Sequence, residues 1–349
     1  MLTSRKLLLL RSGSPLLTLK PRSITTPVSI YTRAISHLVH GHSTARSNTS
    51  FAVNPTTTIL GVVGITTMAG TPPFSDAVVQ AMKNLYPEEL ADKSWDNTGL
   101  LLDQAPSFAE KVGNSTPTVL LTNDLTRTVV DEALEKGANV IVCYHPVIFR
   151  PLKSLTTKDP MQAQLLRLIA VGISVYCPHT AVDAAVGGLN DWLCDILIDG
   201  EQEVKRTVAE PISRLLPESL HSTKTLSAGI GGQKYLMVAL PPTLGDLTKT
   251  QSITKIAVCA GSGADVLKNT DAQVLVTGEM AHHYALRHTQ LGQIVVTCFH
   301  SNSERKFLEQ RLKPQLEAQL HDVSYGNAVV IVSSADRDPF DIIDVRDLA

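Results

Sequence analysis

Short apolar runs alternate with amphipathic stretches along the chain from about residue 73 onward. The runs are rich in Val, Ile and Leu, which is typical of strands buried on both faces. The stretches between them have apolar residues at helical spacing, and several end at Gly. The strands that we predict are Thr118–Thr122, Asn139–Cys143, Ile173–Cys177, Lys255–Ala260, Val274–Thr277, Ile294–Cys298 and Ala328–Val332. The predicted helices are Pro73–Leu85, Thr126–Lys136, Met161–Val171, Asn190–Ile198, Met280–Gln290 and Ser303–Leu320.

The regular alternation of strands and helices predicts an α/β fold with parallel strands and helical crossovers. The pattern weakens between residues 201 and 250, which are polar and contain only a short β-like piece at Tyr235–Leu240. We therefore expect a first α/β lobe over residues 73–200, a linker or insertion over 201–250, and a second α/β lobe over 251–349 that completes one domain.

The second series of elements repeats the first. The segment Gly137–His145 aligns with Asp271–Glu279, and Val171–His179 aligns with Gly292–His300. Beyond that point both series continue with a histidine followed four residues later by an acid, in His179-x-x-x-Asp183 and His300-x-x-x-Glu304. Chance similarity of two apolar strands is the alternative for any one pair. Because strand, helix, strand and His-x-x-x-acid recur in one order, we predict two related lobes that face each other, with a site between them.

Composition excludes several classes of protein. The formal net charge of the 349-residue chain is -2, so no overall basic excess indicates nucleic-acid binding. No uninterrupted apolar run reaches the 18 or more residues that a membrane-spanning helix needs. The five cysteines form no CxxC pair, and we expect free, mostly buried thiols in a reducing compartment.

The first 70 residues differ from the rest of the chain. Seven Lys and Arg residues and many Ser and Thr residues precede the first acidic residue, Asp76. An acid-free, Ser-rich segment that contains Arg is typical of a mitochondrial transit segment. The alternatives are a disordered extension, or translation that starts at Met68 and leaves a cytoplasmic protein. We exclude residues 1–70 from the fold prediction.

Polar residues follow several predicted strands, at the end of the sheet where α/β proteins bind ligands. His145 follows one strand, His179 and Asp183 follow the next, Glu279 follows a third, and His300 and Glu304 follow a fourth. Imidazoles and carboxylates that converge from separate segments favour a divalent metal. The alternatives are ordinary packed histidines and an acid favoured by a helix dipole at Glu304.

These motifs resemble, in order and spacing, the Nif-three-like proteins, a family also described as GTP cyclohydrolase I type 2-like. The resemblance covers about residues 74–335. It is carried by the motifs Trp95-Asp-Asn-Thr-Gly-Leu100, Tyr144-His-Pro146, His179-Thr-Ala-Val-Asp183, Thr277-Gly-Glu279 and His300-Ser-Asn-Ser-Glu304-Arg305. It implies two facing α/β lobes, a di-metal site and a ring-like homo-oligomer, which we expect to be a hexamer.

The resemblance also implies which residues bind the metals. His145, Asp183 and Glu304 would hold one divalent ion, and His300 and Glu304 a second, with Glu304 bridging. Many bacterial relatives have another histidine where this chain has Tyr144, and a phenol is a poor ligand near neutral pH. His179 and Glu279 are expected beside the metals or facing the substrate, and with Glu304 they are the candidate catalytic residues. Zinc, iron, manganese, cobalt and nickel all suit such ligands.

Two further motifs are weaker. Gly261-Ser262-Gly263 is either a backbone cradle for phosphate or, more simply, a tight turn. His282 and His283 are adjacent on a predicted helix and therefore point apart, so we interpret them as a rim or interface feature.

The leading functional hypothesis is a metal-dependent hydrolase acting on a nucleotide or another phosphate-bearing small molecule. GTP ring opening is implied only by the family label, since no motif in the sequence recognises guanine. The alternatives are a metal-stabilised scaffold that binds other proteins without catalysis, and a metal-storage or chaperone role.

Overall fold

The computed structural model of the chain describes residues 8–12, 73–104, 116–198, 204–208, 219–245, 253, 255–323, 325–344 and 346. For residues 8–12, 198, 204–208 and 219–223 it describes the backbone alone. The rest of the extension 1–70, and parts of the predicted linker 201–250, lie outside the described residues. Transit or disorder of the extension therefore stays a prediction.

A five-stranded sheet forms the first lobe, in the order β11-β3-β4-β5-β2. Its centre is parallel, because β3 (Thr118–Thr122), β4 (Val140–Cys143) and β5 (Ser174–Cys177) are joined by helical crossovers. The edge strand β2 (Gly99–Leu102) runs antiparallel to β5, and β11 (Val329–Val332) runs parallel to β3 on the other side.

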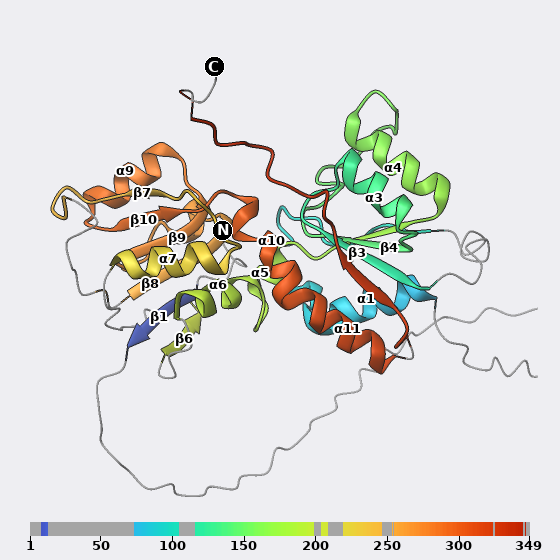
Figure 1. Ribbon diagram of the computed structural model, residues 1–349, viewed down its shortest axis with the longest axis horizontal. Helices are drawn as coiled ribbons and strands as arrows, with labels where there is room; N and C mark the ends of the chain where they lie inside the picture. Colours follow the sequence, from blue (N-terminus) through green and yellow to red (C-terminus); the bar gives the residue numbers. More distant parts are fainter. Residues whose placement is uncertain are drawn as a thin grey trace, which may run out of the picture. The chain divides into compact units, whose positions relative to one another are not determined.

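Helices cover both faces of this sheet (Figure 1). Leu120 and its neighbours on one face pack with residues of α3 (Arg127–Glu135) and α4 (Pro160–Val171). Val119 and Leu121, on the other face, belong to a cluster that includes residues of α1 (Phe74–Leu85) and α11 (Lys313–Asp322). Because successive residues of a strand point to opposite faces, a strand covered on both sides has to be apolar throughout. This explains the uninterrupted apolar runs of the sequence.

A six-stranded sheet forms the second lobe, in the order β6-β1-β8-β9-β10-β7. The strands β8 (Lys255–Ser262), β9 (Val274–Glu279) and β10 (Ile294–Thr297) are parallel, and α9 (His282–Gln290) connects the last two. Three further strands flank this parallel centre and pair antiparallel. They are β1 (Leu8–Ser12), β6 (Val204–Val208) and β7 (Met237–Ala239).

The predicted repeat is present in the structure. The unit β4-α4-β5 of the first sheet has its counterpart in β9-α9-β10 of the second, and in both units the two strands are parallel neighbours. The α/β fold with two related lobes is therefore confirmed.

The chain departs from the predicted lobe boundaries in one respect. The last strand, β11, follows the second lobe in sequence but pairs with β3 in the first sheet, and α11 contacts α1 of the first lobe. The prediction that residues 251–349 form one lobe is wrong for this segment, because the final helix carries the chain back across. In the second sheet, β1 comes from the extension and β6 from the predicted linker, and the sequence predicted neither strand.

Several helices also differ from the prediction. The helix predicted at Ser303–Leu320 is divided into a 3-10 turn η2 (Ser301–Ser303), α10 (Arg305–Phe307), a π-helical turn (Leu308–Leu312) and α11. Short helices that the sequence did not predict are η1 (Glu88–Leu90), α5 (Thr180–Ala184), α7 (Ser219–Gly229) and α8 (Ala264–Leu267). No described helix combines the length and the apolar character that crossing a bilayer requires.

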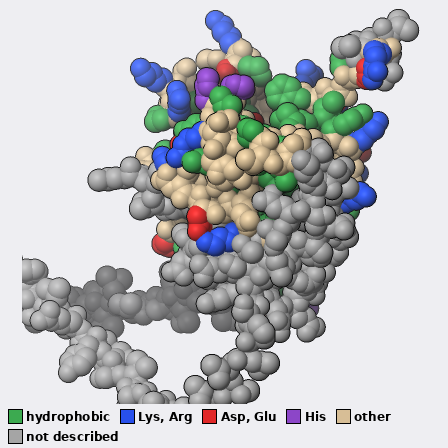
Figure 2. Space-filling model, turned by 90° about the vertical axis from the view of Figure 1, so that its left-hand side faces the viewer, with side chains coloured by type: hydrophobic (Ala, Val, Ile, Leu, Met, Phe, Trp, Pro, Cys, Tyr) green, Lys and Arg blue, Asp and Glu red, His purple; other side chains and the backbone are tan. Residues whose placement is uncertain are grey.

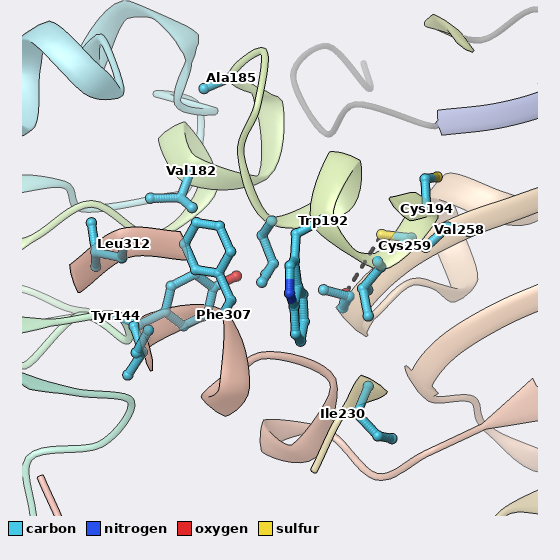
Figure 3. Close-up of a cluster of buried hydrophobic side chains, with 14 of the residues drawn as sticks. Tyr144, Val182, Ala185, Trp192, Cys194, Ile230, Val258, Cys259, Phe307 and Leu312 are labelled. Atoms are coloured by element: carbon cyan, nitrogen blue, oxygen red, sulfur yellow. Dashed lines mark hydrogen bonds between the residues drawn. The ribbon is translucent and has the colours of Figure 1, made fainter. Parts of the chain in front are cut away.

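The core around the end of α10 is aromatic (Figure 3). The ring of Phe307 lies 6.2 Å from that of Tyr86 and 6.0 Å from that of Trp192, in α6 (Leu189–Ile198). All three side chains are buried, and the indole N–H of Trp192 donates to Gln310 at 2.9 Å. All five cysteines are buried thiols outside any disulfide, as predicted.

Candidate metal centre

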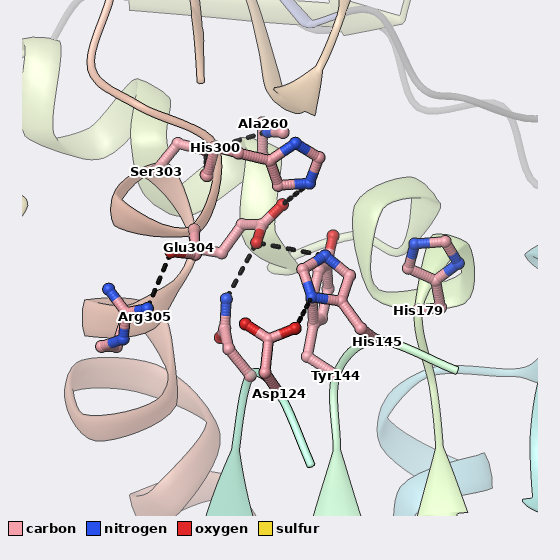
Figure 4. Close-up of polar contacts among 12 residues, drawn as sticks. Asp124, Tyr144, His145, His179, Ala260, His300, Ser303, Glu304 and Arg305 are labelled. Carbon is pink, nitrogen blue, oxygen red and sulfur yellow. Dashed lines mark hydrogen bonds and ion pairs between the residues drawn. The ribbon is translucent and has the colours of Figure 1, made fainter. Parts of the chain in front are cut away.

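Three of the predicted metal ligands come together at the carboxyl ends of the strands (Figure 4). His145 follows β4 of the first sheet, whereas His300 and Glu304 follow β10 of the second. The Nε2 atoms of His145 and His300 each lie 3.5 Å from a different carboxylate oxygen of Glu304. One ligand atom from each of the three residues lies within 4.8 Å of the other two, which makes this triad a candidate metal group.

A carboxylate holds the outer nitrogen of each histidine. Nδ1 of His145 hydrogen-bonds Asp124 at 2.9 Å, and Nδ1 of His300 hydrogen-bonds Glu279 at 3.0 Å. A carboxylate on the far nitrogen fixes the tautomer and the orientation of a metal-binding imidazole. Both Nε2 atoms are thereby directed toward Glu304.

Glu304 is 2% exposed, and a carboxylate buried so deeply needs partners. Its Oε2 accepts a hydrogen bond from the side-chain amide of Asn123 at 2.8 Å, across the two lobes. Burial raises the pKa of Glu304 despite the nearby histidines. Burial alone would lower the pKa of His145, but the carboxylates of Glu304 and Asp124 outweigh it and raise that pKa to about 9. The triad is therefore strongly coupled electrostatically.

The backbone of β8 approaches the triad at a glycine. Gly261 has φ +60°, and a Cβ placed there would lie 2.6 Å from Oε1 of Glu304 and 3.1 Å from Nε2 of His300. The N–H of Gly261 donates to Ser303 Oγ at 2.9 Å, and that hydroxyl donates to the carbonyl of His300 at 2.6 Å. Only glycine fits both the conformation and the space.

The same bonds decide between the two interpretations of Gly261-Ser262-Gly263. The N–H of Gly263 donates to Thr277 Oγ1 at 3.1 Å, and the N–H of Gly261 is used as described above. Both N–H groups donate to side chains of the protein and not to a ligand. The motif is therefore a close turn beside the triad rather than a phosphate cradle.

Asp183, the fourth predicted ligand, is not part of the 4.8 Å group. It is 4% exposed and raises the pKa of both His145 and Glu304, so it lies close enough to act on the triad electrostatically. Its Oδ1 accepts a hydrogen bond from the hydroxyl of Tyr144 at 2.6 Å. Tyr144 thus occupies one oxygen of the carboxylate that the resemblance assigns to a metal.

His179 lies beside the triad on the first lobe. Its ring centroid is 5.7 Å from that of His145, and its Nδ1 hydrogen-bonds Asp96 at 2.7 Å. Thr180 donates to the other oxygen of the same aspartate. His179 has φ +33°, a strained conformation for a residue with a Cβ and one that is concentrated at functional sites.

Sequence reasoning missed Asn123 and Asp124. They directly follow β3, the parallel neighbour of β4, and so occupy the sheet position that identified His145. The same rule, applied to every strand end, would have found them.

The paired histidines His282 and His283 are exposed at the start of α9, with ring centroids 5.3 Å apart. Histidine side chains are visible at the surface in Figure 2, among basic and apolar ones.

The donor set of the triad fits a divalent metal. Two imidazoles held at Nδ1 and one buried carboxylate are the ligands of zinc and of the later transition metals. The buried Oδ1 of Asn123, next to Glu304, has no hydrogen-bond partner among the described residues. An additional polar atom at the site, from a water or a ligand, would satisfy it.

Comparison with known proteins shows the family to which the chain is similar. Residues 75–339 match the model of the family Duf34/NIF3 (NGG1p interacting factor 3). The chain is 41% identical to the protein NIF3 homolog of Schizosaccharomyces pombe, over 76% of this chain and 97% of that protein. It is 39% identical to the NGG1-interacting factor 3 of Saccharomyces cerevisiae, over 76% and 96%. A Bacillus cereus protein related to NIF3 superposes with a TM-score of 0.61 at 21% identity, over 78% of this chain and all of that one. The chain belongs to the Duf34/NIF3 family.

Proposed function

We propose that this protein is a metal-dependent hydrolase of a nucleotide or another phosphate-bearing small molecule. The observation that supports this most strongly is the triad His145, His300 and Glu304, whose ligand atoms lie within 4.8 Å of one another at the strand ends. A divalent cation held there would supply a Lewis acid and would lower the pKa of water toward neutrality.

The surrounding residues have distinct roles in this proposal. Asp124 and Glu279 keep the two metal-binding imidazoles in one orientation through their Nδ1 atoms. His179 is the candidate general acid or base, because Asp96 holds its Nδ1 and leaves Nε2 to exchange a proton. Tyr144 already donates to one oxygen of Asp183, so we propose that a first cation is held by the triad and that Asp183 adds negative charge beside it.

The experiment is metal-dependent turnover of GTP and of simple phosphoesters by the wild type and by Glu304→Gln. We expect turnover to fall by more than about 100-fold, since removing even an outer partner of a metal ligand costs up to about 100-fold. Glu309→Gln is the matched control, because Glu309 is exposed in the helical segment that follows Glu304 and, among the described residues, forms its ion pair with Lys306. A metal-replete wild type that is inert on a broad nucleotide panel would overturn the proposal.

A second candidate function rests on a different observation. The triad joins residues of two sheets, so a bound metal would cross-link the lobes and contribute to folding stability. On this view the protein is a metal-stabilised scaffold that binds other proteins. Removing the metal would then lower the unfolding temperature of the wild type, although no turnover is lost.

A further inference from the structure

Two large aromatic side chains are exposed at the rim of the candidate metal centre. Trp95 is 40% exposed and Phe149 is 47% exposed, and their ring centroids are 5.9 Å apart. Side chains of this size bury a large apolar area when they can, so an exposed adjacent pair indicates a binding surface. Both residues lie in loops of the first lobe. Trp95 lies in the loop around residues 92–98, after η1, and Phe149 lies in the loop around residues 146–149, after β4.

The pair is continuous with the triad. Trp95 lies edge-on to His179, with centroids 5.8 Å apart, and His179 lies 5.7 Å from His145. The ring of His145 in turn lies 5.2 Å from that of His300. A ligand that contacts Trp95 is therefore separated from the first metal-binding histidine by one imidazole ring.

Hydrogen bonds hold the two aromatic loops in place. The side-chain amide of Asn97 donates to the carbonyl of Ile148 at 2.5 Å, which ties one loop to the other. Asp92 accepts from Ser94 at 2.6 Å and is also hydrogen-bonded by the side chain of Trp95. A surface that is fixed before binding loses less entropy when a ligand arrives.

The charge beside the pair complements an anion. Residues 146–158 include Arg150, Lys153 and Lys158 and no acidic residue, and all three basic side chains are exposed. An aromatic surface next to basic side chains is the combination that binds a base by stacking and a phosphate by charge.

We propose that Trp95 and Phe149 form a stacking platform for the heteroaromatic base of a nucleotide, with Arg150 and Lys153 attracting its phosphates. This rests on the proposed function in one respect, since it takes the nucleotide to be the substrate of the triad. It adds the residues that select an aromatic substrate over other phosphoesters.

The test is calorimetric binding of GMP, AMP and ribose 5-phosphate to the metal-loaded full-length chain. Trp95→Ala should weaken binding of both nucleotides by about 5- to 150-fold, the range that base stacking covers. Binding of ribose 5-phosphate, which has no base, should change by less than about twofold. Trp95→Phe should restore most of the nucleotide affinity, because a phenyl ring still stacks.

Two variants complete the design. Phe149→Ala should act in the same direction as Trp95→Ala, whereas Leu155→Ala should have no effect, since Leu155 is 44% exposed in the same basic segment but offers no ring. Unchanged nucleotide binding in Trp95→Ala would overturn the platform. An altered oligomeric state in sedimentation, with nucleotide affinity unchanged, would overturn it in favour of a contact with a second copy.

The outcomes separate this inference from the proposed function. Nucleotide binding that depends on Trp95 without any metal-dependent turnover would support the platform and refute the hydrolase. Turnover with equal KM for aromatic and non-aromatic phosphoesters, unaffected by Trp95→Ala, would support the hydrolase and refute the platform. If both hold, Trp95→Ala should raise KM for nucleotides and leave kcat nearly unchanged.

Discussion

Replacement of Gly261 by Ala tests how closely the backbone of β8 confines the metal triad. An alanine at φ +60° costs about 1–2 kcal/mol of folding stability through the left-handed conformation alone. Its methyl carbon would also lie 2.6 Å from Oε1 of Glu304, which is closer than nonbonded atoms tolerate. The carboxylate has to move, and it is buried and held by Asn123.

Gly137→Ala provides the matched control. Gly137 has φ +64°, and a Cβ there would have no atom within 4 Å, so this variant isolates the backbone strain. We expect Gly261→Ala to lose more unfolding free energy in urea than Gly137→Ala when a chelator is present, because it adds a clash to the backbone strain. Only Gly261→Ala should lose metal affinity, by about 10- to 100-fold, the effect of disturbing a partner of a metal ligand. This corresponds to about 1.4–2.8 kcal/mol in a competition assay with a chromophoric chelator.

The reasoning would be refuted by a Gly261→Ala protein that binds metal within twofold of Gly137→Ala. It would also be refuted if Gly137→Ala lost as much metal affinity as Gly261→Ala, because the effect would then come from general destabilisation.

Three other predictions concern stability. Glu132→Gln should cost about 1–3 kcal/mol at pH 7, because its carboxylate accepts hydrogen bonds from residues 333–335. Burial alone would raise the pKa of Glu132, but those bonds lower it. The stability difference should therefore be complete above about pH 4.3 and disappear as the pH falls further, as urea unfolding at pH 7 and pH 3 will show. Phe307→Ala should cost about 3–5 kcal/mol in the same assay, whereas the exposed Phe340→Ala should change stability by less than about 0.5 kcal/mol. A divalent metal at 100 times its Kd should stabilise the wild type by about 2.7 kcal/mol in thermal unfolding, and a similar gain in His300→Ala would contradict the triad.

The strands of both parallel units could be predicted from the sequence because their burial imposes a local pattern. Thr118–Thr122 is apolar or small at every position, since helices cover both faces, and the strand occupies the predicted residues. The start of a helix could also be predicted from local residues. At Thr126, for example, the side chain accepts a hydrogen bond from the N–H of Val129. Polar residues at the strand ends then indicated all three residues of the triad, and also His179, Asp183 and Glu279 around it.

Other features depend on contacts that no local pattern encodes. The apolar run of β11 would suit either sheet, and only the return of the chain through α11 selects β3 as its partner. The bond between Tyr144 and Asp183 joins residues 39 positions apart, and the histidine spacing gives no indication of it. The ring-like homo-oligomer and the mitochondrial location remain predictions of the sequence.

The pairing of β11 with β3 has a consequence for synthesis on the ribosome. Strand β3 is complete by residue 122, but the strand that covers its outer edge does not begin until residue 329. A nascent chain therefore carries an open, apolar sheet edge during translation of some two hundred residues, a feature that favours mispairing with other chains. Final closure of the first sheet is a late, long-range event, which predicts slow folding and dependence on chaperones.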